Sequence, residues 1–415
     1  MRRLIYMVVV FVMSASVLYA QDYEKAFKDV QQSFDQRSSV AQDHLTEYLE
    51  QYPQTPYRDE VLAMHGVLLS EKGLAKEAIE LLDQVHAEHL SRLIAPTYKF
   101  HLGYAHVQLK NYKKALQYLL PLKTTHDNPY TLQASYYAGF CYYSLREYGQ
   151  ALVEFLALEQ VGGYRKIAPY YIVQIHYAIG EYDKVLTRAE KLLKDYPDNE
   201  YNDELHRLVG EVYYQDSVYN KAASHLETYY TLCTTTNRSV VRNDLYLLGV
   251  SNYRIAQYDQ AIKYLKRVNQ ENDSISESTC LHLGHCYLRV QNLEKAILAY
   301  SAAIQFEINP RLREEAMYNH VQATYLLNSA LGESITAFQR FIKEYPHSKY
   351  IDKVYALMAD MYLTCKNYHA ALEALLEIEK PNAKVQQTCL YLRYQLAADA
   401  FLQDKMSEVL KWTNE

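Results

Sequence analysis

Two histidines and a cysteine stand at a spacing that could hold a metal ion, in the segment His282-x-x-His285-Cys286. Residues three apart share one face of a helix, and imidazole and thiolate groups are the usual protein ligands of zinc. Six cysteines are sparse for a chain of 415 residues, and no Cys-x-x-Cys pair occurs among them. The cysteines therefore do not indicate a disulfide scaffold.

Residue patterns that carry catalysis are missing from the sequence. It contains no His-Glu-x-x-His, no glycine-rich phosphate loop and no Gly-x-Ser-x-Gly. These patterns mark zinc hydrolases, nucleotide sites and serine nucleophiles. The sequence therefore predicts a protein that is not an enzyme and has no cofactor and no small-molecule substrate. The fifteen histidines are spread along the chain, and we predict that they lie on helix surfaces.

The composition indicates helices joined by short turns. Glycine occurs 12 times and proline 10 times in 415 residues, whereas tyrosine occurs 43 times and tryptophan once. So few turn-forming residues argue against a β protein with many turns and against long linkers. The formal net charge is -6, which does not indicate a basic surface that could bind nucleic-acid phosphates. Nucleic acid is therefore not an expected partner.

The N-terminal segment has the three parts of a secretory signal peptide. Arg2 and Arg3 precede the apolar run 4–12, and small residues then lead to Ala20, after which the sequence becomes polar. We predict a signal peptide over residues 1–20 that is cleaved after Ala20 on export. The alternative is a retained signal anchor, because this apolar segment comes close to the length that spans a bilayer.

A repeat organises the rest of the chain. Similar residues recur every 34 to 39 positions, at Ala41, Ala78, Ala115, Ala151, Val185, Ala222, Ala261, Ala296, Ser334, Ala371 and Val409. Twelve residues before many of these lies a second small residue with an apolar neighbour, as in Leu102-Gly103 and Leu283-Gly284. Within each unit the apolar residues are spaced by three and four, which predicts two helices joined by a tight turn.

This repeat resembles the tetratricopeptide repeat (TPR). The family pattern of a small residue and a tyrosine in the first helix, followed by Ala-x3-Phe in the second, is matched by Gly139, Tyr142, Ala151 and Phe155. The resemblance covers residues 24–415. It implies an all-α fold, namely a right-handed superhelical solenoid of about eleven TPR helical hairpins.

The resemblance also divides the chain into segments. It implies an irregular N-terminal capping repeat at residues 21–57 and a TPR array over residues 58–415. The last unit is expected to begin near Tyr391 and to have a short second helix. One interpretation of this short helix is that it is a frayed end of the array. The alternative interpretation is that the chain is part of a longer protein.

Small residues are expected to let the two helices of a hairpin approach each other closely. A bulky residue in place of Gly139 or Ala151 would overpack the hairpin. Cys141 and Cys286 take a position where the family usually has alanine, and Cys280 takes that of the family tryptophan. We therefore predict that these thiols are packed core groups and that no metal is bound at His282-x-x-His285-Cys286.

Three turns between repeats share the pattern Tyr-Pro-x-x-x-Tyr, followed two residues later by an aspartate. They lie at residues 52–57, 196–201 and 345–350. The proline ends the preceding helix, and the polar residues can cap the next one. The turns are similar to those of TPR proteins of the Gram-negative cell envelope. This similarity implies a periplasmic, envelope-associated protein.

In TPR proteins, defined positions on the first helix of each hairpin line a concave groove. In the third to seventh units we expect these residues in a partner-binding groove: Phe100, Tyr104, Tyr136, Phe140, Tyr143, Tyr170, Tyr177, Arg207, Tyr214, Tyr246 and Tyr253. Tyrosine provides a large contact area and a hydroxyl group with little side-chain entropy to lose, which suits an extended peptide or a partner helix. The alternative is that individual tyrosines pack against neighbouring repeats.

One known mode of TPR recognition is not expected here. Family members that bind C-terminal carboxylates use lysine and asparagine at successive groove positions. Arg207 is followed at the next such position by Glu211, which would repel a carboxylate.

The resemblance implies a non-enzymatic scaffold for protein–protein contacts, with a protein or peptide as its partner. Two alternatives remain open at this point. One is a subunit of an outer-membrane assembly or secretion machine. The other is the sensory or regulatory arm of a longer membrane-spanning protein. Membrane contact of this chain itself is expected only through a retained signal anchor.

Overall fold

The protein is an all-α chain built from paired helices. The computed structural model describes residues 23–125, 128–268, 270–327, 331–379, 381 and 383–414, and no strand occurs among them. The helices pair in chain order into eleven hairpins, each with a first helix A and a second helix B. The predicted all-α solenoid of TPR hairpins is therefore confirmed. The predicted signal peptide at residues 1–20 lies outside the described residues.

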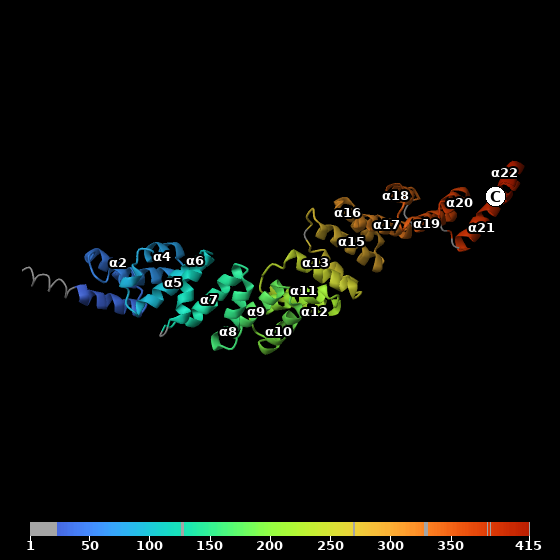
Figure 1. Ribbon diagram of the computed structural model, residues 1–415. Helices are drawn as coiled ribbons and strands as arrows, with labels where there is room; N and C mark the ends of the chain where they lie inside the picture. The colour runs from blue at the N-terminus through green and yellow to red at the C-terminus, as the bar shows by residue number, and fades with distance from the viewer. Residues whose placement is uncertain are drawn as a thin grey trace, which may run out of the picture. The chain divides into compact units, whose positions relative to one another are not determined.

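The helices gather into two compact units, Met1–Tyr201 and Asn202–Glu415. In the first unit, blue to green in Figure 1, a helix over residues 23–35 precedes nine further α-helices and two short 3-10 helices. These are α2 (Ala41–Gln51), α3 (Arg58–Glu71), α4 (Ala75–Leu82), η1 (Ala87–His89), α5 (Ile94–Gln108), α6 (Tyr112–Thr124), α7 (Thr131–Ser144), α8 (Tyr148–Leu158), η2 (Gly162–Tyr164), α9 (Ile167–Ala178) and α10 (Tyr182–Asp195).

The second unit runs from green to red in Figure 1 and contains six hairpins. Their helices are α11 (Asn202–Gln215), α12 (Tyr219–Thr235), α13 (Arg242–Arg254), α14 (Tyr258–Leu265), α15 (Ser274–Arg289), α16 (Leu293–Phe306), α17 (Pro310–Leu327), α18 (Leu331–Glu344), α19 (Ile351–Thr364), α20 (Tyr368–Leu376), α21 (Ala383–Leu402) and α22 (Met406–Asn414). The last hairpin begins at Ala383, so its predicted start near Tyr391 is wrong. Among the described helices, none is both long and apolar enough to cross a membrane.

The turn inside each hairpin has one recurring form. In the ten hairpin turns that the structure describes completely, the second residue after helix A has a left-handed backbone, with φ between 50° and 79°. The next residue donates its N–H to the carbonyl five residues earlier, as Asn111 does to His106 at 2.8 Å. This is the Schellman arrangement, which satisfies the last carbonyl groups of a helix. In nine of these ten turns helix B begins two residues after the left-handed residue and folds back on helix A.

The two helices of a hairpin touch where helix A carries a glycine. A Cβ atom on Gly249 would lie 2.5 Å from Leu265, and one on Gly284 would lie 2.4 Å from Tyr300. Gly139 is less tightly covered, because a Cβ atom there would meet Glu154 at 3.0 Å. The small residues of helix B, such as Ala151, are fully buried. These close approaches confirm the predicted role of small residues.

The Tyr-Pro turns link one hairpin to the next by aromatic stacking. The second tyrosine of each motif lies nearly parallel to a ring on the preceding helix A. The ring centroids are 4.1 Å apart for Tyr57 and Phe27, 4.4 Å for Tyr170 and Tyr201, and 4.2 Å for Tyr318 and Tyr350. The motif is thus a device of repeat packing.

Candidate functional site

All eleven predicted groove residues lie on A helices of consecutive hairpins. Phe100 is buried, and the others are half-buried. The first unit holds Phe100 and Tyr104 on α5, Tyr136, Phe140 and Tyr143 on α7, and Tyr170 and Tyr177 on α9. The second unit holds Arg207 and Tyr214 on α11, and Tyr246 and Tyr253 on α13. The predicted set therefore forms two groups, one in each compact unit.

In the first unit, one aromatic residue on each of α5, α7 and α9 packs against a tyrosine of the next inter-repeat segment. The ring centroids are 4.5 Å apart for Phe100 and Tyr130, and 5.6 Å apart for Tyr136 and Tyr164. Tyr170 stacks on the turn in the same way, as described above. One face of each of these rings is therefore occupied by the protein itself.

The tyrosines near the ends of the A helices pack against the first residue of the B helix in the same hairpin. The ring centroids of Tyr143 and Tyr148 are 6.0 Å apart. The corresponding distances are 5.9 Å for Tyr177 and Tyr182, 5.7 Å for Tyr214 and Tyr219, and 6.1 Å for Tyr253 and Tyr258. These contacts fix the ring positions and leave each A-helix tyrosine half-exposed.

A hydrogen-bonded chain connects the aromatic residues of α7 and α9. The hydroxyl group of Tyr143 donates to Gln174 Oε1 at 3.5 Å, and Gln174 Nε2 donates to the hydroxyl oxygen of Tyr170 at 3.0 Å. Polar groups are thus held in place between half-buried rings. Such a surface offers both apolar area and oriented hydrogen-bonding groups to a ligand.

Arg207 is held by acidic neighbours on its own helix. Its guanidinium donates to Glu204 at 2.5 and 2.7 Å and to Glu211 at 2.5 Å. Burial lowers the pKa of Arg207, but these bonds and the charges of Glu204, Glu211 and Asp244 raise it more, so it rises overall. With its cation neutralised in this way, Arg207 is poorly suited to bind a ligand carboxylate.

A cavity of about 710 Å³ opens beside the A helices of the second unit. Its lining includes Tyr253 of α13, His285 of α15, and Asn319 and Gln322 of α17. Burial, followed by the charges of His282 and Arg289, lowers the pKa of His285 to about 4. The cavity therefore presents the neutral polar side chains of Asn319 and Gln322 and the cation of Arg289 beside a predicted groove tyrosine.

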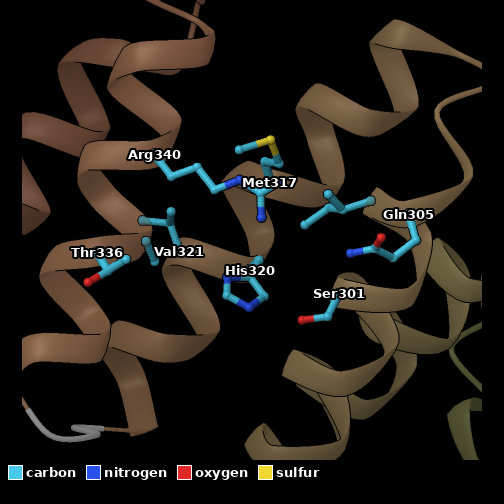
Figure 2. Close-up of a pocket in the computed structure, with 9 residues that line it drawn as sticks. Ser301, Gln305, Met317, His320, Val321, Thr336 and Arg340 are labelled. Atoms are coloured by element: carbon cyan, nitrogen blue, oxygen red, sulfur yellow. The ribbon is translucent and has the colours of Figure 1, made fainter.

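A second cavity, of about 450 Å³, lies among α16, α17 and α18. Figure 2 shows His320 and Met317 of α17 at its centre, with Arg340 and Thr336 of α18 on one side and Ser301 of α16 on the other. Burial and then the charge of Arg340 lower the pKa of His320. No predicted groove residue lines this cavity.

The histidines and cysteines only partly follow the predictions. Cys141, Cys280 and Cys286 are buried, as predicted. His282 donates its Nδ1–H to the Ser278 carbonyl at 2.7 Å, whereas His285 Nε2 lies 3.5 Å from a Glu315 oxygen.

The prediction that the histidines lie on helix surfaces is wrong for three buried residues, His101, His106 and His176. The sequence patterns did not predict a cluster that the structure forms from Asp59, His86 and His89. The spacing His86-x-x-His89 was its only local signal, because the aspartate lies 27 residues earlier.

Stacked helical hairpins with glycine contacts and aromatic groove positions define a helical-repeat protein. Family models described as tetratricopeptide repeat match residues 96–120, 245–273 and 277–307, which fall on three of the hairpins. The chain is a tetratricopeptide-repeat protein. No curated protein matches it.

Solved structures of TPR proteins are similar to the chain. One from Parabacteroides merdae is 18% identical, with a TM-score of 0.40, over 64% of this chain and 99% of that one. YrrB, described as a TPR protein with an unusual peptide-binding site, is 16% identical with a TM-score of 0.38, over 51% and 97%. The C-terminal part of a TPR repeat-containing protein from Cytophaga hutchinsonii is 13% identical with a TM-score of 0.37, over 70% and 98%.

Proposed function

We propose that this protein is a non-enzymatic scaffold that binds a peptide segment or a partner helix along the aromatic faces of its A helices. The observation that supports this most directly is the cavity of about 710 Å³ beside α13, α15 and α17, which includes the predicted groove residue Tyr253. Half-buried tyrosines with fixed rings lose little entropy on binding, which is why they serve as anchors in interfaces.

The test must separate binding from packing, because the same tyrosines do both. Peptides selected from a displayed library on the wild-type protein serve as probes, and their affinity is measured by fluorescence anisotropy. The triple variant Tyr143→Ala, Tyr177→Ala and Tyr214→Ala removes the A-helix rings. We expect it to weaken binding at least about tenfold, since each tenfold loss corresponds to about 1.4 kcal/mol.

The chain provides a matched control for this variant. Tyr148→Ala, Tyr182→Ala and Tyr219→Ala remove the B-helix partners of the same three rings, and so lose the same ring contacts. We expect the control to keep the affinity within about threefold, which is less than 1 kcal/mol. Equal affinity of the A-helix variant and the wild type, with unchanged circular dichroism, would rule out the groove.

We further propose that the protein acts in the periplasm of a Gram-negative cell, after removal of residues 1–20. The proposal rests on the N-terminal sequence pattern and on the Tyr-Pro turns. Expression of the full chain with its N-terminal segment should give a periplasmic product that begins at Gln21 on N-terminal sequencing. A product that retains Met1 and sediments with the membranes would instead identify the segment as an anchor.

A further inference from the structure

Three metal-ligating side chains from separate parts of the first unit meet beside the start of α3. Asp59 is in the first turn of α3, His86 directly precedes η1, and His89 is the last residue of η1. One ligand atom from each lies within 4.8 Å of the other two. Within the described part of the chain, this is the one group of three histidine, cysteine, aspartate or glutamate side chains that comes so close together.

The short 3-10 helix directs both imidazoles at the carboxylate. Residues three apart lie above one another in a 3-10 helix, and the ring centroids of His86 and His89 are 5.4 Å apart. The Nδ1 atoms of these histidines lie 3.3 Å from Asp59 Oδ1 and 2.6 Å from Asp59 Oδ2. Zinc bound at its usual distances separates two tetrahedral ligands by about 3.3 Å. A small rotation of the rings therefore makes room for the ion.

The burial of the cluster suits a site that is open on one side. The side chain of Asp59 is 12% exposed, whereas those of His86 and His89 are 66% and 59% exposed. The backbone N–H of His86 donates to Asp59 Oδ1 at 3.1 Å and holds the carboxylate in place.

The equivalent residue of another Tyr-Pro turn shows what is particular to Asp59. Asp203 also follows the second tyrosine of its motif by two residues and has a buried side chain. There the carboxylate forms an ion pair with Arg238 at 2.5 Å. At Asp59 two imidazoles take the place of this cation. Imidazole differs from guanidinium in that its free nitrogen can coordinate a metal.

We propose that Asp59, His86 and His89 bind one Zn²⁺ ion, with a water molecule as the fourth ligand. Two imidazoles and one carboxylate form an N₂O donor set typical of zinc, whereas Mg²⁺ and Ca²⁺ prefer oxygen ligands alone. The bound ion connects α3 to the segment that leads into α5. Its expected effect is to stabilise the N-terminal hairpins.

The experiment titrates chelator-treated full-length protein with ZnCl₂ in an isothermal calorimeter. We expect one saturable site per chain and a rise in melting temperature with added Zn²⁺ that MgCl₂ does not produce. Cobalt as a spectroscopic substitute should show ligand-field bands without thiolate charge transfer, because no cysteine takes part. The variants His86→Gln and His89→Gln should each weaken binding at least about tenfold.

The control variant is His347→Gln, since His347 is an exposed histidine in another Tyr-Pro turn. It should bind Zn²⁺ as the wild type does. Both histidines of the cluster are exposed, so their replacement leaves the fold intact, as circular dichroism should verify. The proposal is overturned if the wild type shows no saturable site, or if the double variant His86→Gln, His89→Gln binds as tightly as the control. In either case the role of Asp59 is limited to its hydrogen bonds with His86 and His89.

Discussion

Replacing Gly284 by alanine is expected to lower the free energy of unfolding by about 3 kcal/mol, the upper part of the range for overpacked cores. The added Cβ atom would lie 2.4 Å from Cε1 and 2.5 Å from Cδ1 of Tyr300. Tyr300 is fully buried, and its ring cannot yield by turning a flexible end. Helix α15 must therefore move away from α16. Urea unfolding followed by circular dichroism measures the loss.

Gly149→Ala is the matched control for this substitution. Gly149 is also helical, but it is exposed, and a Cβ atom built on it would meet nothing within 4 Å. Alanine favours the helix over glycine, so we expect equal or slightly higher stability. Equal urea midpoints for Gly284→Ala and Gly149→Ala would contradict the close contact of α15 and α16.

Replacing Asp244 by asparagine is expected to stabilise the protein above pH 7, by up to about 4 kcal/mol. Asp244 is 2% exposed, and its Oδ2 atom has no hydrogen-bond partner in the described structure. Burial, followed by the neighbouring Glu211 carboxylate, raises its pKa to about 7, although Arg207 and Tyr229 lower it in part. Ionising this group therefore costs free energy in the folded state.

The sign of the pH dependence follows from the raised pKa of Asp244. Between about pH 4 and pH 7 the folded chain keeps a proton that the unfolded chain releases. The contribution of Asp244 to the free energy of unfolding therefore falls as the pH rises through that window, and it is constant above pH 7. Asparagine mimics the protonated form. The variant and the wild type should have similar urea midpoints near pH 4, and the variant should be more stable at pH 8.

Asp273→Asn provides a control of opposite sign. Hydrogen bonds from Arg242 and from the backbone of Ser276 lower the pKa of Asp273. The charged form of Asp273 is thus favoured in the folded state. Asparagine should therefore destabilise the protein at pH 8, and the loss of stability should be smaller at acidic pH. If Asp244→Asn also lost stability at pH 8, the burial of an unfavourable charge at Asp244 would be refuted.

The sequence was sufficient to predict the paired helices, except for the start of the last hairpin, and the A-helix location of the eleven candidate groove residues. Helical periodicity predicts the two helices of each unit, and the TPR resemblance assigned Tyr143 and Tyr177 to the first of them. The inter-repeat tyrosines that pack on Phe100, Tyr136 and Tyr170 were harder to predict, because inter-repeat segments differ in length. Tyr164, for example, reaches Tyr136 from the short helix η2.

Clusters formed between repeats were not predictable from local patterns. Asp59 meets His86 and His89 only because α4 folds back and returns the chain to the start of α3. Asp244 likewise faces Glu211 of the preceding hairpin. Such pairs are separated by about one repeat in sequence, and their contacts depend on how the hairpins pack.

The left-handed turns inside the hairpins bear on how this sequence has evolved. Glycine adopts that backbone without steric cost, yet eight of the ten turns use another residue, namely Arg37, Lys110, Arg146, Ser217, Ala256, Gln291, Lys366 and Asp404. Each of these residues carries a conformational penalty of about 1 kcal/mol. Such penalties are tolerated in a protein whose stability exceeds the threshold needed for function. The array therefore has a reserve of unused stabilising substitutions in the turns inside its hairpins.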